Sequence, residues 1–164
     1  MSAMQTDEIS IVPLPAGFER WDELLGLIRR SFAPMDGVID PPSSAHRLTS
    51  LSLEAKAREE TAFLATVADR LAGCVFLADK GSHLYLGKLA IDPAFQGQGV
   101  GRRLVEAAED HARKLGRTAV ELQTRIELAA NHTVFGRLGF RETARTAHPG
   151  YRRPTTITMR KELG

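Results

Sequence analysis

Hydrophobic positions along the chain recur with two spacings, every second residue in some segments and every third or fourth residue in others. The first spacing predicts strands, and the second predicts helices with one apolar stripe. The two kinds of segment alternate, which predicts a mixed α/β (α+β) fold whose central sheet of about six or seven strands is flanked by helices. The predicted strands are residues 9–14, 61–68, 71–78, 83–91, 118–125, 140–145 and 155–161, and the predicted helices are residues 19–32, 53–59, 100–115 and 128–138.

The order of these segments also predicts part of the topology. Three predicted strands between residues 61 and 91 follow one another through short polar turns, so they should form an antiparallel meander. The chain then enters a glycine-rich loop, the helix of residues 100–115 and the strand of residues 118–125. A strand, a helix and a strand in this order form a right-handed crossover, and ligands of open α/β sheets bind at its carboxyl edge. The residues of that helix expected to face solvent are Glu106, Glu109, Asp110, Arg113 and Lys114.

Composition narrows the class of protein. A chain of 164 residues with 43% hydrophobic and 26% charged residues suits one globular domain over residues 1–164. The formal net charge of +2 is small and its basic residues are interleaved with acidic ones, so nucleic acid is not an expected partner. Cys74 is the only cysteine, which excludes an internal disulfide or a cysteine zinc site and favours a cytoplasmic location. No signal segment or membrane-length apolar run is present, and no metal site is predicted.

The most informative segment is the glycine-rich loop. It reads Gln96-Gly97-Gln98-Gly99-Val100-Gly101 and follows an apolar strand and the pair Asp92-Pro93. Glycines allow a sharp turn, and the first N–H groups of the following helix have no partner within the helix. The helix dipole adds positive potential at the same point, so the loop is suited to bind a phosphate through its backbone. Arg102 and Arg103 lie in the first helical turn, where a bound anion would offset their unfavourable interaction with the dipole.

Three kinds of phosphate loop can be compared with these letters. A Walker A loop requires Lys-Ser or Lys-Thr after its last glycine, and neither pair is present. A dinucleotide-binding loop would use Gly97 and Gly99, and Glu121 lies at a suitable distance for a ribose contact, but Arg102 occupies the third glycine position. This leaves a nicotinamide-dependent oxidoreductase as one alternative. The pattern Gln-x-x-Gly-x-Gly fits all six positions from Gln96 to Gly101.

Together with the preceding strand and the Asp-Pro turn, this pattern resembles the acetyl-CoA pyrophosphate loop of the GNAT N-acetyltransferase superfamily. The resemblance covers about residues 60 to 160. It implies a splayed central strand pair, with the pantetheine of acetyl-CoA bound to the backbone of the central strand. The cofactor-binding residues that it implies are Leu89, Ala90, Ile91, Gln96, Gly97, Gln98, Gly99, Val100, Gly101 and Arg102.

Members of this family also carry a helix that ends in Gly-Phe, matched here by Gly139-Phe140. An asparagine early in that helix contacts the cofactor, and a tyrosine one turn before the glycine protonates the departing thiolate. Here Leu128 occupies the asparagine position and Asn131 follows one turn later, so Asn131 is the expected contact. Phe135 occupies the tyrosine position, where it can line the cofactor site but cannot donate a proton.

Other residues are therefore candidates for proton transfer. Tyr151 and His132 are candidate acids, in that order of preference. Glu121 lies in an apolar strand and is a candidate general base if it is buried without a partner, whereas an arginine nearby would make it one half of a salt bridge.

The resemblance implies transfer of an acetyl group from acetyl-CoA to an amine by direct attack in a ternary complex, without Cys74 as a nucleophile. A backbone N–H near Ala90 or Ile91 would polarise the thioester carbonyl. The acceptor would be a small molecule or a peptide or protein amine, and a homodimer is common in the family. The missing tyrosine leaves a non-catalytic acyl-CoA-sensing module as another alternative. For acceptor recognition we expect the irregular segment of residues 33–44, where Asp36 and Asp40 would attract a cationic amine.

Overall fold

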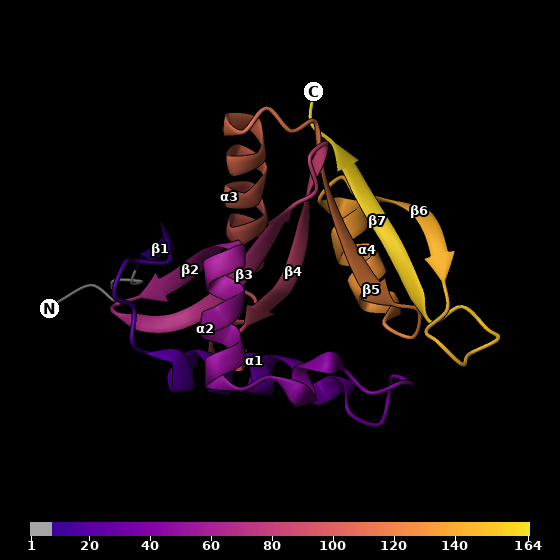
Figure 1. The fold of residues 1–164 in the computed structure, drawn as a ribbon, viewed down its shortest axis with the longest axis horizontal. Helices are drawn as coiled ribbons and strands as arrows, with labels where there is room; N and C mark the ends of the chain where they lie inside the picture. Colours follow the sequence, from indigo (N-terminus) through magenta and orange to yellow (C-terminus); the bar gives the residue numbers. More distant parts are fainter. Residues whose placement is uncertain (1–7) are drawn as a thin grey trace, which may run out of the picture.

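A computed structural model describes residues 8–164, and Figure 1 shows its path. Within these residues the chain forms seven strands and four α-helices, joined in places by short 3-10 helices. The strands are β1 (Ile9–Pro13), β2 (Thr61–Val67), β3 (Arg70–Asp79), β4 (His83–Ile91), β5 (Ala119–Arg125), β6 (Arg141–Thr146) and β7 (Thr156–Glu162). The α-helices are α1 (Trp21–Phe32), α2 (Ser50–Glu59), α3 (Val100–Lys114) and α4 (Ala129–Arg137), and the 3-10 helices are η1 (Ala33–Met35), η2 (Ser44–Arg47) and η3 (Pro93–Phe95).

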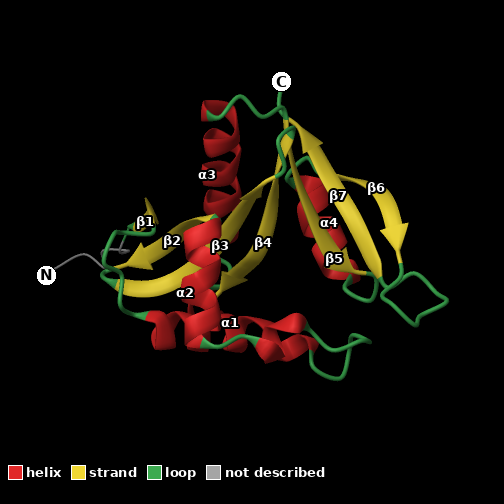
Figure 2. Ribbon diagram, viewed as in Figure 1, coloured by secondary structure: helices red, strands yellow, loops and turns green. Residues whose placement is uncertain are grey.

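All seven strands of residues 8–164 belong to one mixed sheet, in the order β1-β2-β3-β4-β5-β7-β6 (Figure 2). Strands β2, β3 and β4 pair antiparallel, which confirms the predicted meander. Strand β5 returns parallel to β4 after α3, and β7 then pairs antiparallel with β5. The predicted mixed sheet flanked by helices is therefore confirmed.

The helices cover the two faces of the sheet and divide the core into two clusters. The inner residues of α1 and α2, such as Leu24 and Leu53, pack on one face together with Phe76 of β3. The apolar stripe of α3, including Leu104, packs on the other face with Val75 of the same strand. Strand β3 thus supplies side chains to both clusters, because successive strand residues point to opposite faces.

Two glycines allow the N-terminal end of α3 to lie close to the sheet. A Cβ on Gly73 would stand 2.8 Å from the Ala90 carbonyl oxygen and 3.0 Å from a Val100 methyl group. A Cβ on Gly101 would stand 3.3 Å from Ile91 Cδ1. Because both side chains are absent, the first turn of α3 rests directly against the end of β4.

Several local predictions needed correction. The segment of residues 33–44 was expected to be an irregular loop, but residues 33–35 form η1. Helix α2 begins three residues earlier than expected, because Thr49 and Ser52 form a reciprocal capping box. Glu109 was expected to face solvent, but it is 7% exposed and its Oε1 accepts a hydrogen bond from Lys161 Nζ at 3.0 Å.

Candidate active site

The parallel pairing of β4 with β5 is short, and a cavity opens where it ends. Residues His83 to Leu86 of β4 pair with Ala119 to Leu122 of β5, and the register goes no further. Beyond it β4 stays paired with β3, while β5 stays paired with β7. Figure 2 shows the two strands diverging from this point. The space between them is a cavity of about 570 Å³, lined by residues 86–89 of β4 and residues 122–125 of β5.

A bulge in β4 coincides with this opening. The register between β3 and β4 shifts between Cys74 and Phe76, and Lys88 adopts a left-handed backbone conformation with φ of 51°. Cys74 lies beneath the bulge, and its thiol contacts the Lys88 carbonyl oxygen at 3.4 Å. Complete burial raises the pKa of Cys74 to about 12, so its sulfur stays a thiol. The geometry agrees with the expectation that Cys74 is not a nucleophile.

The glycine-rich loop lies between η3 and α3. Asp92 caps η3 by accepting the Ala94 N–H at 2.9 Å. Gly97 and Gly99 have φ of 79° and 83°, which supports the sequence argument that glycine is needed there. In residues 8–164, the backbone N–H groups of residues 97–102 have no hydrogen-bond acceptor, since the first bond of the helix runs from the Arg103 N–H to the Gly99 carbonyl oxygen. Consecutive unpaired N–H groups at a helix start form an anion site.

The side chains of Val100, Arg102 and Arg103, at the start of α3, have different roles. Arg102 is exposed and lies 3.7 Å from Glu106, so it can turn toward a ligand. Arg103 does not serve the loop as expected, because its guanidinium donates to the Ile9 carbonyl oxygen at 2.7 Å and ties α3 to β1. Val100 is 1% exposed and packs in the core, which leaves only its backbone for a ligand.

The three β4 residues expected to bind pantetheine are not equivalent. Leu89 lines the cavity. Ala90 does not, because it is fully buried and paired with Cys74 of β3. The Ile91 N–H is already bonded to the Ser31 hydroxyl at 3.1 Å, so it is not free to polarise a carbonyl. Leu89 directly follows the bulge at Lys88 and is absent from the register of β4 with β3, which passes from Gly87 to Ala90.

Helix α4 closes the other wall of the cavity. Leu128, Asn131 and Phe135 all line it, as expected from residues three and four apart on one helix. The Phe135 ring also packs edge-on against Phe140, with 6.0 Å between centroids. The aromatic side chain in the tyrosine position is thus held by the start of the next segment.

Glu121 and His132 are both engaged elsewhere. Glu121 Oε2 accepts a hydrogen bond from Arg160 at 3.1 Å, and His83 lies 3.8 Å from its other oxygen. Glu121 lines a separate, smaller cavity rather than the one beside Leu89. The salt-bridge interpretation of Glu121 is therefore correct, and the unpaired base is not. The His132 ring contacts the Arg125 carbonyl oxygen at 2.9 Å and does not line the main cavity.

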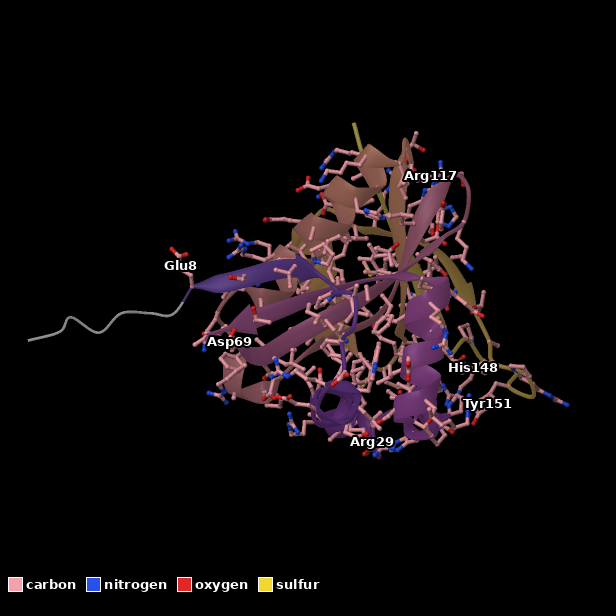
Figure 3. The ribbon with its side chains drawn as sticks, turned by 60° about the vertical axis from the view of Figure 1, so that its left-hand side comes forward. Glu8, Arg29, Asp69, Arg117, His148 and Tyr151 are labelled. Atoms are coloured by element: carbon pink, nitrogen blue, oxygen red, sulfur yellow. The ribbon has the colours of Figure 1, made fainter. Side chains whose placement is uncertain are left out.

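Tyr151 also lies outside the main cavity. Its hydroxyl donates to Asp40 at 2.7 Å, and this bond raises the pKa of Tyr151, which makes it a weaker acid. Figure 3 labels Tyr151 beside His148 on the loop between β6 and β7. His148 does line the cavity, and burial followed by the charge of Arg125 lowers its pKa. Tyr85 is the tyrosine that lines the cavity.

The two aspartates expected to attract a cationic amine both bind neighbouring side chains outside the cavity. Asp36 pairs with His46 at 2.6 Å, and Asp40 pairs with Arg153 at 3.4 Å in addition to Tyr151. Neither aspartate lines the cavity, although other residues of the 33–44 segment do. Sequence reasoning missed the basic residues of the wall, Arg47, Lys56, Lys88 and Arg125. The one available signal was Gly87-Lys88, which interrupts an apolar strand.

Membrane-spanning helices and metal-binding clusters are both absent from residues 8–164. No helix of residues 8–164 is long and apolar enough to span a membrane. The same residues hold no cluster of three histidine, cysteine, aspartate or glutamate side chains placed to bind a metal ion.

Comparison with known proteins bears on this geometry. The model of the Acetyltransferase (GNAT) family matches residues 21–140. Among solved structures, the ribosomal-protein-S18-alanine N-acetyltransferase of Escherichia coli is similar with a TM-score of 0.73 and 21% identity, over 95% of this chain and 94% of that one. A GNAT family acetyltransferase of Elizabethkingia anophelis with acetyl-CoA bound is similar with a TM-score of 0.67 and 19% identity, over 94% of this chain and 98% of that one. At these identities the structures show a shared fold.

A curated relative is similar over a shorter stretch. An uncharacterized N-acetyltransferase of Methanocaldococcus jannaschii is 38% identical over 55 residues, which are 34% of this chain. The match spans about a quarter, 24%, of that relative's length.

Proposed function

Because its residues 21–140 match the family model, the chain belongs to the acetyltransferase (GNAT) family, and we propose that it transfers an acetyl group from acetyl-CoA to an amine. The observation that carries this proposal is the position of the cavity between β4 and β5: its last lining residue on β4 is Leu89, two residues before Ile91, which lies against Gly101 at the start of α3. A thioester in the cavity and a pyrophosphate on the loop would then belong to one ligand.

The cofactor would be held mainly by backbone. The unpaired N–H groups of residues 97–102 bind the pyrophosphate, with Arg102 as an additional cation. Gln96 and Gln98 frame this turn. Leu89 pairs with the pantetheine, and Asn131 and Phe135 contact it from α4. Ala90 and Ile91 shape the strand without contacting the cofactor, because their polar groups face β3 and Ser31.

The reaction would be direct attack within a ternary complex. The nitrogen of a neutral amine bonds to the thioester carbon, the carbon–sulfur bond breaks, and CoA leaves as a thiolate. The nitrogen loses one proton to solvent, and the thiolate takes one up. The Leu89 N–H polarises the carbonyl oxygen, since that of Ile91 is occupied. Holding both substrates in one cavity supplies proximity. A CoA thiol with a pKa near the cysteine value of about 8.5 has a thiolate that departs without strong acid assistance. The reaction therefore does not require a proton donor at Phe135, which occupies the tyrosine position.

The direct test is release of CoA thiol from acetyl-CoA on addition of a panel of primary amines. We expect release that depends on the amine and yields one acetylated product per thiol. Tight binding of acetyl-CoA, without release for any amine, would instead identify an acyl-CoA-sensing module. A fluorescence response to NAD(P)H with none to CoA would favour the oxidoreductase alternative.

Gly99→Val should weaken CoA binding at least tenfold. A Cβ at this position would meet no protein atom within 4 Å, so valine would not clash with the rest of the chain. It would instead strain the backbone, whose φ is 83°, and occupy the space in which the pyrophosphate would meet the free N–H groups. Gly81→Val is the matched control, because Gly81 has φ of 88° and similar open space in the β3–β4 turn. Both variants should lose similar stability, whereas calorimetry should detect weaker CoA binding for Gly99→Val alone. Equal CoA affinity in the two folded variants would refute the loop assignment.

Tyr151→Phe and His132→Ala should both keep kcat and its pH profile within about threefold, because neither side chain lines the cavity and the Tyr151 proton is bonded to Asp40. Tyr85→Phe is the comparison on the cavity wall. A tenfold fall in kcat for Tyr151→Phe or His132→Ala, with unchanged CoA affinity, would show that solvent is not the proton donor.

A further inference from the structure

The cavity between β4 and β5 has a basic wall. Four lysine and arginine side chains line it, and no aspartate or glutamate of residues 8–164 does. The chain as a whole has a formal charge of only +2, so this separation of charge is local. The basic residues are Arg47 of η2, Lys56 of α2, Lys88 of β4 and Arg125 of β5.

Two of these cations already have strong partners. Lys56 Nζ lies 2.7 Å from Glu60, which offsets its charge. The Arg125 guanidinium donates to the Pro41 and Pro42 carbonyl oxygens at 2.7 and 3.1 Å, so it fixes the loop that forms one rim of the cavity.

Lys88 and Arg47 are different. Lys88 is half-buried and donates only to the neutral Ser44 hydroxyl, at 2.8 Å. Arg47 is exposed, and no carboxylate of the described chain lies within ion-pair distance of either residue. Burial, followed by the charges of Lys56 and Arg47, lowers the pKa of Lys88, whereas the charge of Glu60 acts in the opposite direction and is smaller in effect. A half-buried cation without an ion-pair partner gains most from a bound anion.

We infer that the acceptor is an amine that carries an anionic group, a carboxylate or a phosphate, and that Lys88 and Arg47 bind this group. The inference rests on the proposed function and names its substrate class. It replaces the expectation of a cationic acceptor, because Asp36 and Asp40 are paired outside the cavity.

The anion bound here would not be the cofactor's pyrophosphate. Arg47 and Lys56 belong to η2 and α2, which lie on the α1 face of the sheet. The glycine-rich loop begins α3, which packs on the opposite face. The two anion sites thus belong to elements on opposite faces of the sheet.

The same charges assist the chemistry. Positive charge around the site lowers the pKa of an ammonium group, which favours the neutral amine needed for attack. The salt-bridged Glu121 is then not required as a base. The anionic group of the acceptor is attracted by Lys88 and Arg47, while its amino group is deprotonated more readily by the same field.

The experiment compares matched acceptors. The panel consists of primary amines with two to six carbons, including α-amino compounds. Each carbon chain is tested in three forms, in which the second group is a carboxylate, a carboxamide or another amine. A further acceptor, 2-aminoethyl phosphate, carries a phosphate in place of the carboxylate. Release of CoA thiol gives kcat/KM for each. We expect anionic members to exceed their matched carboxamides at least tenfold, the effect of one charge-assisted contact. Preference for 2-aminoethyl phosphate over the carboxylates would identify phosphate as the anion.

Variants assign that preference to residues. Lys88→Gln and Arg47→Gln should each reduce the ratio of kcat/KM for the anionic acceptor to kcat/KM for its carboxamide about tenfold, mainly by raising KM for the anionic acceptor, with the affinity for CoA unchanged. Arg47 is exposed, so its variant folds even if Lys88→Gln disturbs the bulge. Arg58→Gln is the control, because Arg58 is exposed on α2 and pairs with Glu54 at 3.5 Å away from the cavity.

Three results would overturn the inference, each in a different way. Equal or better turnover of carboxamides or diamines would exclude an anionic acceptor and leave acetyl transfer intact. An anionic preference that neither Lys88→Gln nor Arg47→Gln reduces would exclude these residues as its source. Absence of amine-dependent thiol release in the whole panel would overturn the proposed function, and the inference would fall with it.

Discussion

The parting of β4 from β5 after only four paired residues is the constraint on which the site depends. A parallel pair that continued would bond its own backbone groups and fill the space between the strands. Instead each strand keeps its outer partner, and the bulge at Lys88 interrupts β4 beside the cavity. Gly73 and Gly101 bring the start of α3 against the end of this same strand, so the free N–H groups follow the cavity along β4.

The charged residues near the cavity have two different roles. The acidic residues of the 33–44 segment hold loops together, with Asp36 on His46 and Asp40 on Tyr151. Lys88 then faces the cavity without a carboxylate partner in the described chain. Because the interior of a cleft screens charge less than open water does, a few unpaired cations determine which ligands enter, even when the net charge of the chain is close to zero.

Local sequence patterns predicted the elements, the order of the central strands and the glycine conformations, because periodicity, turn residues and positive φ are properties of neighbouring residues. They could not predict pairings between distant residues. Tyr151 and Asp40 are 111 positions apart, and the bond between them removes a candidate acid. The Ser31 hydroxyl accepts a hydrogen bond from the Ile91 N–H, although the two residues are 60 positions apart. Glu109, on an otherwise polar helix face, is buried in an ion pair with Lys161. Each of these contacts depends on how the helices dock on the sheet.

Amide hydrogen exchange resolved by residue, with and without CoA, tests the central claim most directly, since the claim concerns backbone N–H groups. Binding of CoA should slow exchange at residues 97–102 and at Leu89, while Ile91, already bonded to Ser31, should change little. Saturation with CoA, measured independently, without protection of residues 97–102 would contradict the account.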